Sequence, residues 1–349
     1  MTDETMNRVS AESDTGETAG SVAMPELLTV CPSPHIKHKD TTATIMRDVL
    51  IALTPALLWG TYVFGSRALT LVLFCVACSV GFEALTQKLL HRPITVGDLS
   101  AAVTGLLLGL NLPATAPYWM AMIGCAFAIV LVKQLFGGIG KNFMNPALAA
   151  RVFLFAWPTQ MTSFPAPFDR LPFWSFRAAA DAVASATPLK SLRAGELGDV
   201  SLLDLFLGRC GGCIGEISAL LLALGGIYLI CRKVITWHIP VAFLGTVALL
   251  SLVSAPAGMN AFTYMAASLF SGGLFLGAIF MATDYVTSPV TARGRLIFGV
   301  GCGLITVFIR RFGGYAEGVS FSILIMNSLV WYIDKFTRPR VFGGGAKRG

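Results

Sequence analysis

Long apolar stretches, separated by short polar segments, dominate the chain between residues 47 and 336. A helix needs about 20 predominantly apolar residues to cross the hydrocarbon core of a bilayer. Most of the stretches reach that length or nearly reach it, and two short ones end at Pro113 and Pro158. The pattern predicts about ten membrane-spanning helices, over residues 47–65, 68–90, 97–113, 118–137, 143–158, 214–231, 238–255, 263–282, 294–311 and 318–336.

The composition agrees with this interpretation. Hydrophobic residues make up 55% of the chain, charged residues make up only 13%, and the mean hydropathy is +0.71. Soluble domains carry about 25% charged residues, so we expect an all-α polytopic membrane protein. The net charge of +7 does not indicate a nucleic-acid partner, because the basic residues are spread along segment ends and are not clustered with aromatic residues.

The distribution of Lys and Arg predicts the orientation. If the N-terminus is cytoplasmic, most of the basic residues fall in connections and tails on the cytoplasmic side. Short cytoplasmic connections of membrane proteins carry such an excess. We therefore expect both termini to be cytoplasmic and the long polar segment 159–213 to lie on the opposite side.

Two short patterns occur twice and suggest an internal repeat. GLLLG at 105–109 resembles GLFLG at 273–277, and FGG at 136–138 matches FGG at 312–314, in the same order and at nearly the same spacing. Five predicted helices separate the members of each pair, so the two halves would be inverted in the membrane. Inverted repeats build the midplane sites of many transporters. Short Gly-Leu patterns also recur by chance in membrane helices, where glycine lets helices pack closely.

Together these features divide the chain into five parts. Two repeats of five helices are expected, joined by an extracytoplasmic loop and flanked by cytoplasmic tails. The predicted parts are an acidic, disordered tail (1–32), a first repeat (33–158), the loop (159–213), a second repeat (214–336) and a basic tail (337–349).

One stretch of the loop, DAVASATPLK at 181–190, contains the residue on which the functional hypothesis rests. A threonine hydroxyl is a weak nucleophile, and by its own chemistry Thr187 would be an ordinary loop residue before a proline. A role for it comes only from a wider resemblance.

Several motifs resemble the RnfD/NqrB family, whose members are membrane subunits of the Rnf (ferredoxin:NAD) and sodium-pumping NADH:quinone oxidoreductase complexes. The resemblance covers about residues 33–336, nearly the whole chain. It is carried by SPHIKHKDTTATIMRD at 33–48, IALTPA at 51–56, KNFMNPA at 141–147, SGGLFLGA at 271–278, and MATD at 281–284 followed by Ser288-Pro289.

The resemblance implies a covalently bound flavin. In this family a flavin transferase attaches FMN through its phosphate to the threonine of a motif that ends in Ala-Thr and is preceded by an acidic residue. Here Asp181 is the acidic residue, and Ala186 and Thr187 are the acceptor pair. In a bacterial inner-membrane protein, the orientation predicted from the charges places this loop in the periplasm. Ser185 stands where glycine is frequent, and it is still small enough to let the transferase approach.

Other residues have weaker assignments. The family motif suggests a flavin-binding or inter-helix role for Asn142, Asn145 and Arg151, and a structural pair is the alternative for Arg151. Ionisable groups in the hydrocarbon region usually face the protein interior. Glu83 and Asp284 could belong to an ion path, or could be snorkelling or capping residues. The aromatic residues of the loop could shield the flavin or form an interfacial belt; they are Phe164, Phe168, Phe173, Trp174 and Phe176.

The cysteines form two C-x-x-C pairs, Cys75/Cys78 in a predicted helix and Cys210/Cys213 at the end of the loop. Four cysteines can hold an iron–sulfur cluster, but the predicted topology places the two pairs at different depths. Small buried thiols explain the first pair, and a disulfide or free thiols explain the second. We expect no metal site, because the dispersed histidines also fit no zinc spacing.

The resemblance implies a membrane component of an Rnf-type, ion-translocating oxidoreductase that passes electrons through the covalent FMN between ferredoxin and NAD. No dinucleotide-binding fingerprint is present, so we expect no catalytic residues in this chain alone. Partners would be other membrane subunits, peripheral flavin and iron–sulfur subunits, and the flavin transferase. A second, non-covalent flavin and the choice of Na⁺ or H⁺ are left open. The alternatives are the NqrB component of a sodium-translocating NADH:quinone oxidoreductase, which is typically longer at its N-terminus, and a solute channel or secondary transporter.

Overall fold

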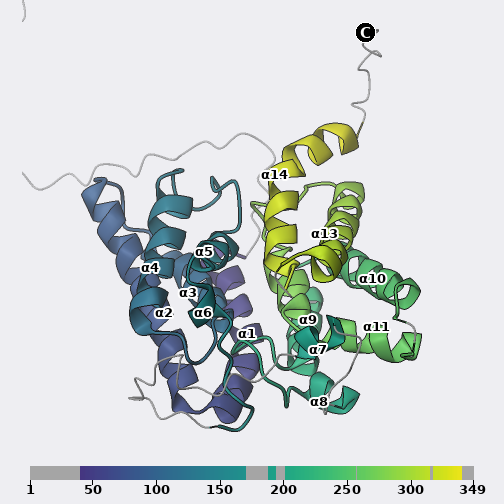
Figure 1. Cartoon of the computed structure of the whole chain (residues 1–349). Coiled ribbons are helices and arrows are strands. Elements are labelled where there is room, and N and C mark those ends of the chain that lie inside the picture. The colour runs from purple at the N-terminus through teal and green to yellow at the C-terminus, as the bar shows by residue number, and fades with distance from the viewer. Residues whose placement is uncertain (1–39, 170–187, 194–200, 257, 315–316, 340–349) are drawn as a thin grey trace, which may run out of the picture. The chain divides into compact units, whose positions relative to one another are not determined.

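The computed structural model describes residues 40–169, 188–193, 201–256, 258–314 and 317–339. Within these residues every regular element is helical and no strand occurs, which confirms the predicted all-α class. In Figure 1 the helices of the N-terminal half, purple to teal, lie beside those of the C-terminal half, green to yellow.

All five helices predicted for the first half are present. They are α1 (Thr42–Phe64), α2 (Ser66–Leu89), α3 (Ser100–Leu110), α4 (Tyr118–Ala126) continued by the π-helix η2 (Phe127–Gln134), and α5 (Pro146–Leu154), with the short η1 (Val96–Asp98) and α6 (Pro158–Met161) between or after them.

Local sequence sets the ends of these helices. The side chain of Thr41 accepts a hydrogen bond from the backbone N–H of Thr44, and the Thr44 hydroxyl accepts one from the backbone N–H of Thr41 in return, so α1 begins with a capping box. Gly65 then separates α1 from α2 with a φ of +88°, a value that favours glycine. At α5, Asn145 caps the N–H groups of the first turn, and Pro146 occupies the first helical position.

The second half contains five further helical segments and is preceded by two short helices. The segments are α9 (Ala219–Cys231), α10 (His238–Val253), α11 (Ala261–Phe270) with α12 (Leu274–Leu276) and the π-helix η3 (Gly277–Met281), α13 (Ala292–Phe312) and α14 (Val319–Thr337), and the short helices are α7 (Pro188–Arg193) and α8 (Leu202–Leu207).

One predicted helix, 263–282, is broken. Its two parts, α11 and α12–η3, meet at an angle of 62°. The break lies at Gly272, which has a φ of +72°, and at Gly273, whose N–H donates to the carboxylate of Glu317 at 2.9 Å. The glycine pair supplies the conformation, and Glu317 supplies the hydrogen-bond acceptor that the helix no longer provides.

Helices pack in a similar order within each half. In the first half, the second helix α2 packs on the third and fourth helices, α3 and α4. In the second half, α10 packs on α11 and α13 in the same way. In both halves the fourth helix packs on the fifth. Between the halves, the first helices α1 and α9 meet, and so do the fifth helices α5 and α14. Equivalent helices therefore meet at the interface between the halves.

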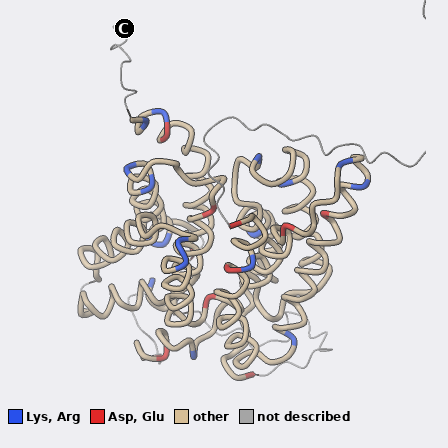
Figure 2. Tube along the Cα trace, turned by 180° about the vertical axis from the view of Figure 1, so that it is seen from behind, with Lys and Arg blue, Asp and Glu red and all other residues tan. Residues whose placement is uncertain are grey.

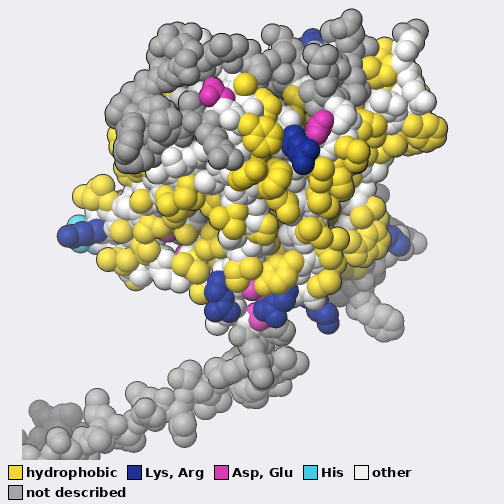
Figure 3. Space-filling view, turned by 90° about the horizontal axis from the view of Figure 1, so that it is seen from below, with side chains coloured by type: hydrophobic (Ala, Val, Ile, Leu, Met, Phe, Trp, Pro, Cys, Tyr) yellow, Lys and Arg dark blue, Asp and Glu magenta, His cyan; other side chains and the backbone are white. Residues whose placement is uncertain are grey.

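Among the described residues, three helices, α1, α2 and α13, are long and apolar enough to cross a membrane, and the bent pair α11 with α12–η3 would make a fourth. Four shorter apolar segments accompany them, at Ser100–Leu110, Tyr118–Gln134, Ala219–Cys231 and His238–Val253. Figure 3 shows hydrophobic side chains spread over much of the described surface. These features suit a multi-pass membrane protein, and the count of ten spans stays a prediction.

Candidate functional site

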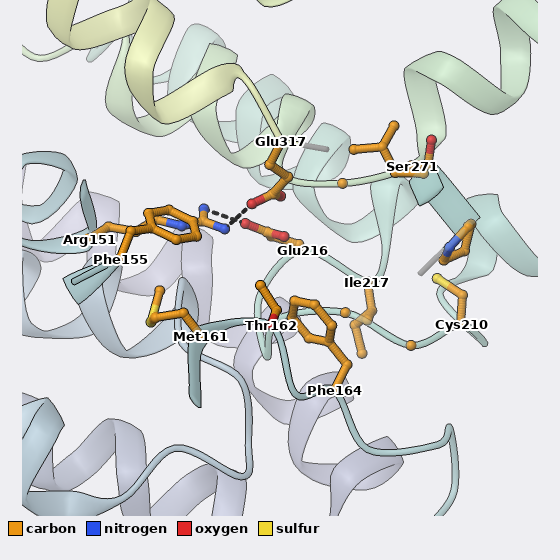
Figure 4. Close-up of a pocket in the computed structure, with 15 residues that line it drawn as sticks. Arg151, Phe155, Met161, Thr162, Phe164, Cys210, Glu216, Ile217, Ser271 and Glu317 are labelled. Carbon is orange, nitrogen blue, oxygen red and sulfur yellow. Dashed lines mark hydrogen bonds and ion pairs between the residues drawn. The ribbon is translucent and has the colours of Figure 1, made fainter. Parts of the chain in front are cut away.

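A cavity of about 80 Å³ lies where loops of the two halves meet, and we call it the Arg151 pocket (Figure 4). Its wall is mostly apolar, from Phe155, Met161, Phe164, Leu189 and Ile217, and its base is charged. Pro188, the residue that follows Thr187 in the sequence, also lines this pocket.

The charged base is organised by Arg151 of α5. Its guanidinium donates to the carboxylate of Glu216 at 2.5 Å and to the carboxylate of Glu317. It also donates to the side-chain oxygen of Asn111 and lies 3.5 Å from the sulfur of Cys213. Arg151 is 3% exposed, so its charge depends on these partners for compensation. Its Nε is a buried donor with no hydrogen-bond partner in the described part of the chain.

This cluster joins the two halves. Arg151 and Asn111 belong to the first half, whereas Glu216 precedes α9 and Glu317 precedes α14 in the second. The break between α11 and α12 packs directly against this cluster, since a Cβ on Gly273 would lie 2.5 Å from the carboxylate of Glu216. Glycine is therefore required there for the close approach.

The thiols beside the cluster are free. Cys210 lines the Arg151 pocket, Cys213 contacts Arg151, and both are buried. Burial raises the pKa of the Cys210 thiol to about 12, with smaller contributions from the carboxylates of Asp204 and Glu216. A thiol with such a pKa is protonated at neutral pH and reacts poorly. Of the two explanations left open for this pair, the structure has the free thiols.

A larger cavity, of about 290 Å³, lies at the other end of α3 and α5, and we call it the Asn145 pocket. Apolar side chains of α1, α3 and η3 line it, among them Ile45, Val103 and Phe280. Its polar lining comes from Ser100, Thr104, Lys133, Asn142, Asn145 and Asp284.

Asn145 and Asp284 are fixed by neighbouring groups. The Asn145 amide donates to the carbonyl of Met281 at 3.2 Å, while its oxygen caps α5. Thr287 donates to Asp284 at 3.1 Å. Burial raises the pKa of the Asp284 carboxyl above its ordinary value, and the hydrogen bonds from Thr287 and from backbone groups oppose that rise.

A second buried ion pair lies at the rim of the Asn145 pocket. The ammonium of Lys133 is 2.6 Å from the carboxylate of Glu83 and 2.6 Å from the hydroxyl of Ser100. Gln134 donates to the same carboxylate at 2.7 Å. Glu83 is 1% exposed, so the snorkelling alternative for this residue is wrong. Figure 2 shows charged residues of both signs among the helices as well as at their ends.

The structure separates the residues that the motifs singled out. Asn142 and Asn145 line the larger pocket, and Arg151, further along α5, lines the smaller one. Phe164 lines the Arg151 pocket, and Phe168 is exposed. Outside the described residues lie the predicted flavin motif, Asp181, Ser185, Ala186 and Thr187, and the aromatic residues Phe173, Trp174 and Phe176.

Three residues of the Arg151 cluster were missed: Asn111, Glu216 and Glu317. A signal for the two acids exists, because each stands next to glycine at the start of a predicted helix, on the side of the membrane predicted for Thr187. A buried arginine needs such partners. The Cys75/Cys78 pair is in α2, and the described residues contain no group of three residues arranged to hold a metal ion.

Comparisons with known proteins agree with these motifs. A family model described as "NQR2, RnfD, RnfE family" matches residues 29–343. The D subunit of a Na⁺-translocating ferredoxin:NAD⁺ oxidoreductase complex from Acetobacterium woodii is 53% identical over 320 residues, covering 90% of this chain and 95% of the relative. The D subunit of a proton-translocating ferredoxin:NAD⁺ oxidoreductase complex from Clostridium ljungdahlii is 41% identical over 336 residues, covering 91% and 96%. The D subunit of an ion-translocating oxidoreductase complex from Stutzerimonas stutzeri is 42% identical over 327 residues, covering 87% and 92%.

Proposed function

This chain belongs to the NQR2, RnfD, RnfE family, and we propose that it is the membrane redox component of an Rnf-type complex, an ion-translocating ferredoxin:NAD oxidoreductase. The similarity to the Acetobacterium and Clostridium proteins supports this, because in each case it runs over nine-tenths of both chains. One of these relatives is named for Na⁺ and the other for protons, so the proposal does not include the coupling ion.

The first part of the proposal is an FMN joined by a phosphoester to Thr187, within the motif of Asp181, Ser185 and Ala186. The observation that carries it is the place of Pro188, the next residue in the chain, on the wall of the Arg151 pocket. A tether at this position keeps the flavin at high local concentration beside the pocket.

The Arg151 pocket fits an edge of a flavin. Its apolar and aromatic wall suits a flat ring system, and the unpartnered Nε of Arg151 suits a ring nitrogen or carbonyl as acceptor. At about 80 Å³ it is smaller than the roughly 300–1,000 Å³ of pockets that enclose a whole ligand. The rest of the ring would lie against the loop or a neighbouring subunit, where it can exchange electrons. When bound, the isoalloxazine supplies the electron transfer, and the protein supplies position and electrostatics.

The second part is a non-covalent flavin in the Asn145 pocket. Its volume, about 290 Å³, is close to that of enclosed ligand sites. Apolar walls are combined there with Thr104, Lys133 and Asn142, a mixture of donors and acceptors that suits a ring with several carbonyl and nitrogen atoms. Asn142 donates to the carbonyl of Met144, which fixes its orientation.

Shared helices connect the two pockets. Helix α3 lines the Asn145 pocket with Ser100 and Thr104, and Asn111 at its C-terminal end contacts Arg151. Helix α5 likewise passes from Pro146 in one pocket to Arg151 and Phe155 in the other. An eleven-residue helix such as α3 is about 16 Å long. Two redox groups stacked along these helices would carry electrons across much of the membrane.

We propose the same orientation that the charges predict, with both termini cytoplasmic in a bacterial inner membrane and the Thr187 loop periplasmic. The ten spans would form two inverted halves. The contact of first helix with first helix and of fifth with fifth supports a two-fold relation between the halves. The two glycine-rich repeats, in α3 and in α12–η3, both run between the pockets.

Partners follow from what the chain lacks. Other membrane subunits, together with peripheral flavin and iron–sulfur subunits, would bring ferredoxin and NAD to the complex, and a flavin transferase would attach the FMN. The main alternative is the NqrB component of a sodium-translocating NADH:quinone oxidoreductase. A solute transporter would use the two-fold arrangement without a flavin.

Flavin fluorescence tests the proposal. The chain is expressed with a flavin transferase, denatured and run on a gel, and the peptide that contains Thr187 is weighed by mass spectrometry. We expect a fluorescent band and an FMN adduct at Thr187, and Thr187→Val should lose both while still inserting into the membrane. A dark wild-type band would contradict the covalent flavin and leave the transporter as the better explanation. Activity of the complex with ferredoxin rather than with a quinone separates the two redox alternatives.

A further inference from the structure

A third cavity, of about 30 Å³, lies among α7, α10, α11 and α13, and we call it the Arg310 pocket. Three arginines line it, one from α7 and two from the end of α13, together with hydroxyl groups from α10 and α11. These residues are Arg193, Arg310, Arg311, Ser251, Tyr264 and Ser268. No acidic side chain is among the described residues that line it.

Of the three arginines, Arg310 has the most hydrogen bonds to the described backbone. Its guanidinium donates to the carbonyl of Ser268 at 2.6 Å and to the carbonyl of Ser271 at 3.2 Å. Its Nε is buried and has no hydrogen-bond partner in the described part of the chain. Arg311 donates to the carbonyl of Ser254 at 2.8 Å. Carbonyl oxygens orient these guanidinium groups without neutralising them.

The charges around the pocket do not balance. On the adjoining side, the carboxylates of Glu216 and Glu317 pair with Arg151, and Glu317 also lies close to Arg310, so two anions stand against two cations. Arg193 and Arg311 come in addition, and both are exposed. The described part of this region therefore carries an excess of positive charge around a small polar cavity, which suits an oxyanion.

The Arg310 pocket adjoins the Arg151 pocket. Leu189 lines both cavities. A Cβ on Gly272, which lines the Arg151 pocket, would lie 3.4 Å from Arg310 and 3.4 Å from Leu189. Leu189 is the second residue after Thr187, and Arg193 closes the same short helix, α7. The segment that follows the predicted attachment residue thus lies between the apolar wall of the Arg151 pocket and the basic Arg310 pocket.

We propose that the Arg310 pocket binds a phosphate group, and that in the mature protein this group is the phosphoester between the flavin and Thr187. This assignment rests on the proposed function. Arginine binds phosphate through two parallel N–H donors, and a tethered phosphate occupies such a site at high effective concentration. Arg310 would then act as a positioning residue that fixes the tether while the ring lies against the Arg151 pocket. A phospholipid headgroup offers the same phosphate chemistry, and the experiment distinguishes the two sources.

The test is a double-mutant cycle on the purified complex, with the thermal unfolding temperature of this chain as the readout. The four proteins are wild type, Thr187→Val, Arg310→Gln and the double variant, all expressed with the flavin transferase. We expect the flavin-loaded wild type to unfold several degrees above Thr187→Val, and we expect Arg310→Gln to abolish most of that difference. Arg310→Lys should keep part of it, and Arg293→Gln, an exposed arginine at the other end of α13, should keep all of it.

Inorganic phosphate probes the empty site. Phosphate should raise the unfolding temperature of Thr187→Val and should leave both the loaded wild type and the double variant unchanged. An equal effect of Arg310→Gln with and without flavin, together with no protection by phosphate, would overturn the proposal and make Arg310 a structural residue.

Lipid composition separates the sources. The unfolding temperature is also measured in nanodiscs with phosphatidylglycerol and in nanodiscs with neutral lipid only. If phosphatidylglycerol stabilises the loaded and the unloaded protein equally, and only when Arg310 is present, the pocket binds a lipid headgroup. That result would overturn the tether. Mass spectrometry of the peptide with Thr187 is recorded for every sample. If it finds no adduct, the proposed function and the tether both fail, and protection by phosphate still decides whether the pocket binds phosphate.

Discussion

Two buried ion pairs lie beside two cavities of this protein, and they are built differently. In the Asn145 pocket, Lys133 and Glu83 pair one to one, and both residues belong to the first half. In the Arg151 pocket, one guanidinium faces two carboxylates, both supplied by loops of the second half. The first pair joins α2 to η2. The second is a joint between halves, so changes there should affect the assembly of the whole transmembrane unit.

The largest effect should follow Arg151→Met. Removing the guanidinium leaves Glu216 and Glu317 close together without their direct ion-pair partner, and breaking a buried pair costs about 3–5 kcal/mol. We expect a large fall in the thermal unfolding temperature and reduced recovery of the chain in detergent. Adding Glu216→Gln to this variant should restore part of the stability; if the double variant is no more stable than Arg151→Met, the cluster is not held by charge.

Lys133→Met should be milder. It leaves a single carboxylate, and Gln134 still donates to Glu83. Breaking a buried pair costs about 3–5 kcal/mol, and the hydrogen bond that Gln134 keeps should place this change at the lower end of that range. In the same unfolding measurement, Lys133→Met should therefore be more stable than Arg151→Met. The double variant Lys133→Met/Glu83→Gln should be more stable than Lys133→Met or Glu83→Gln alone. A reversed ranking would mean that the first-half pair, not the joint between halves, dominates.

Gly273→Ala sharpens the comparison without changing a charge. The new Cβ would lie 2.5 Å from the carboxylate of Glu216, and overpacking of this kind costs about 1–3 kcal/mol. Gly245→Ala in α10 is the matched control, because nothing lies within 4 Å of its Cβ. There alanine should be neutral or stabilise by up to about 1 kcal/mol. Equal effects of the two changes on the unfolding temperature would show that Glu216 can move freely.

The sequence predicted the helices better than the site, for a physical reason. Hydrophobic stretches report burial in lipid or protein, and every predicted span contains a helix. The break at Gly272 was not predicted, since hydropathy continues through it and the carboxylate that accepts the freed N–H belongs to Glu317, far along the chain. Arg151 was recognised as a buried cation, but its carboxylate partners lie 65 and 166 residues away, a pairing that only the fold creates.

The smallest effect should be on thiol chemistry, and it probes the Arg151 pocket directly. Cys210 and Cys213 are buried, and the pKa of Cys210 is raised to about 12, whereas Cys231 at the end of α9 is exposed. The thiolate is the reactive form, so at about pH 7–8 a maleimide should label Cys231 much faster than Cys210. Mass spectrometry of the labelled peptides measures both rates, with Cys231→Ser as the control for assignment.

Arg151→Met should speed the labelling of Cys210 if it opens the pocket, while Lys133→Met should leave that rate unchanged. Rapid labelling of Cys210 in the wild type would contradict the packing of the loop around this site.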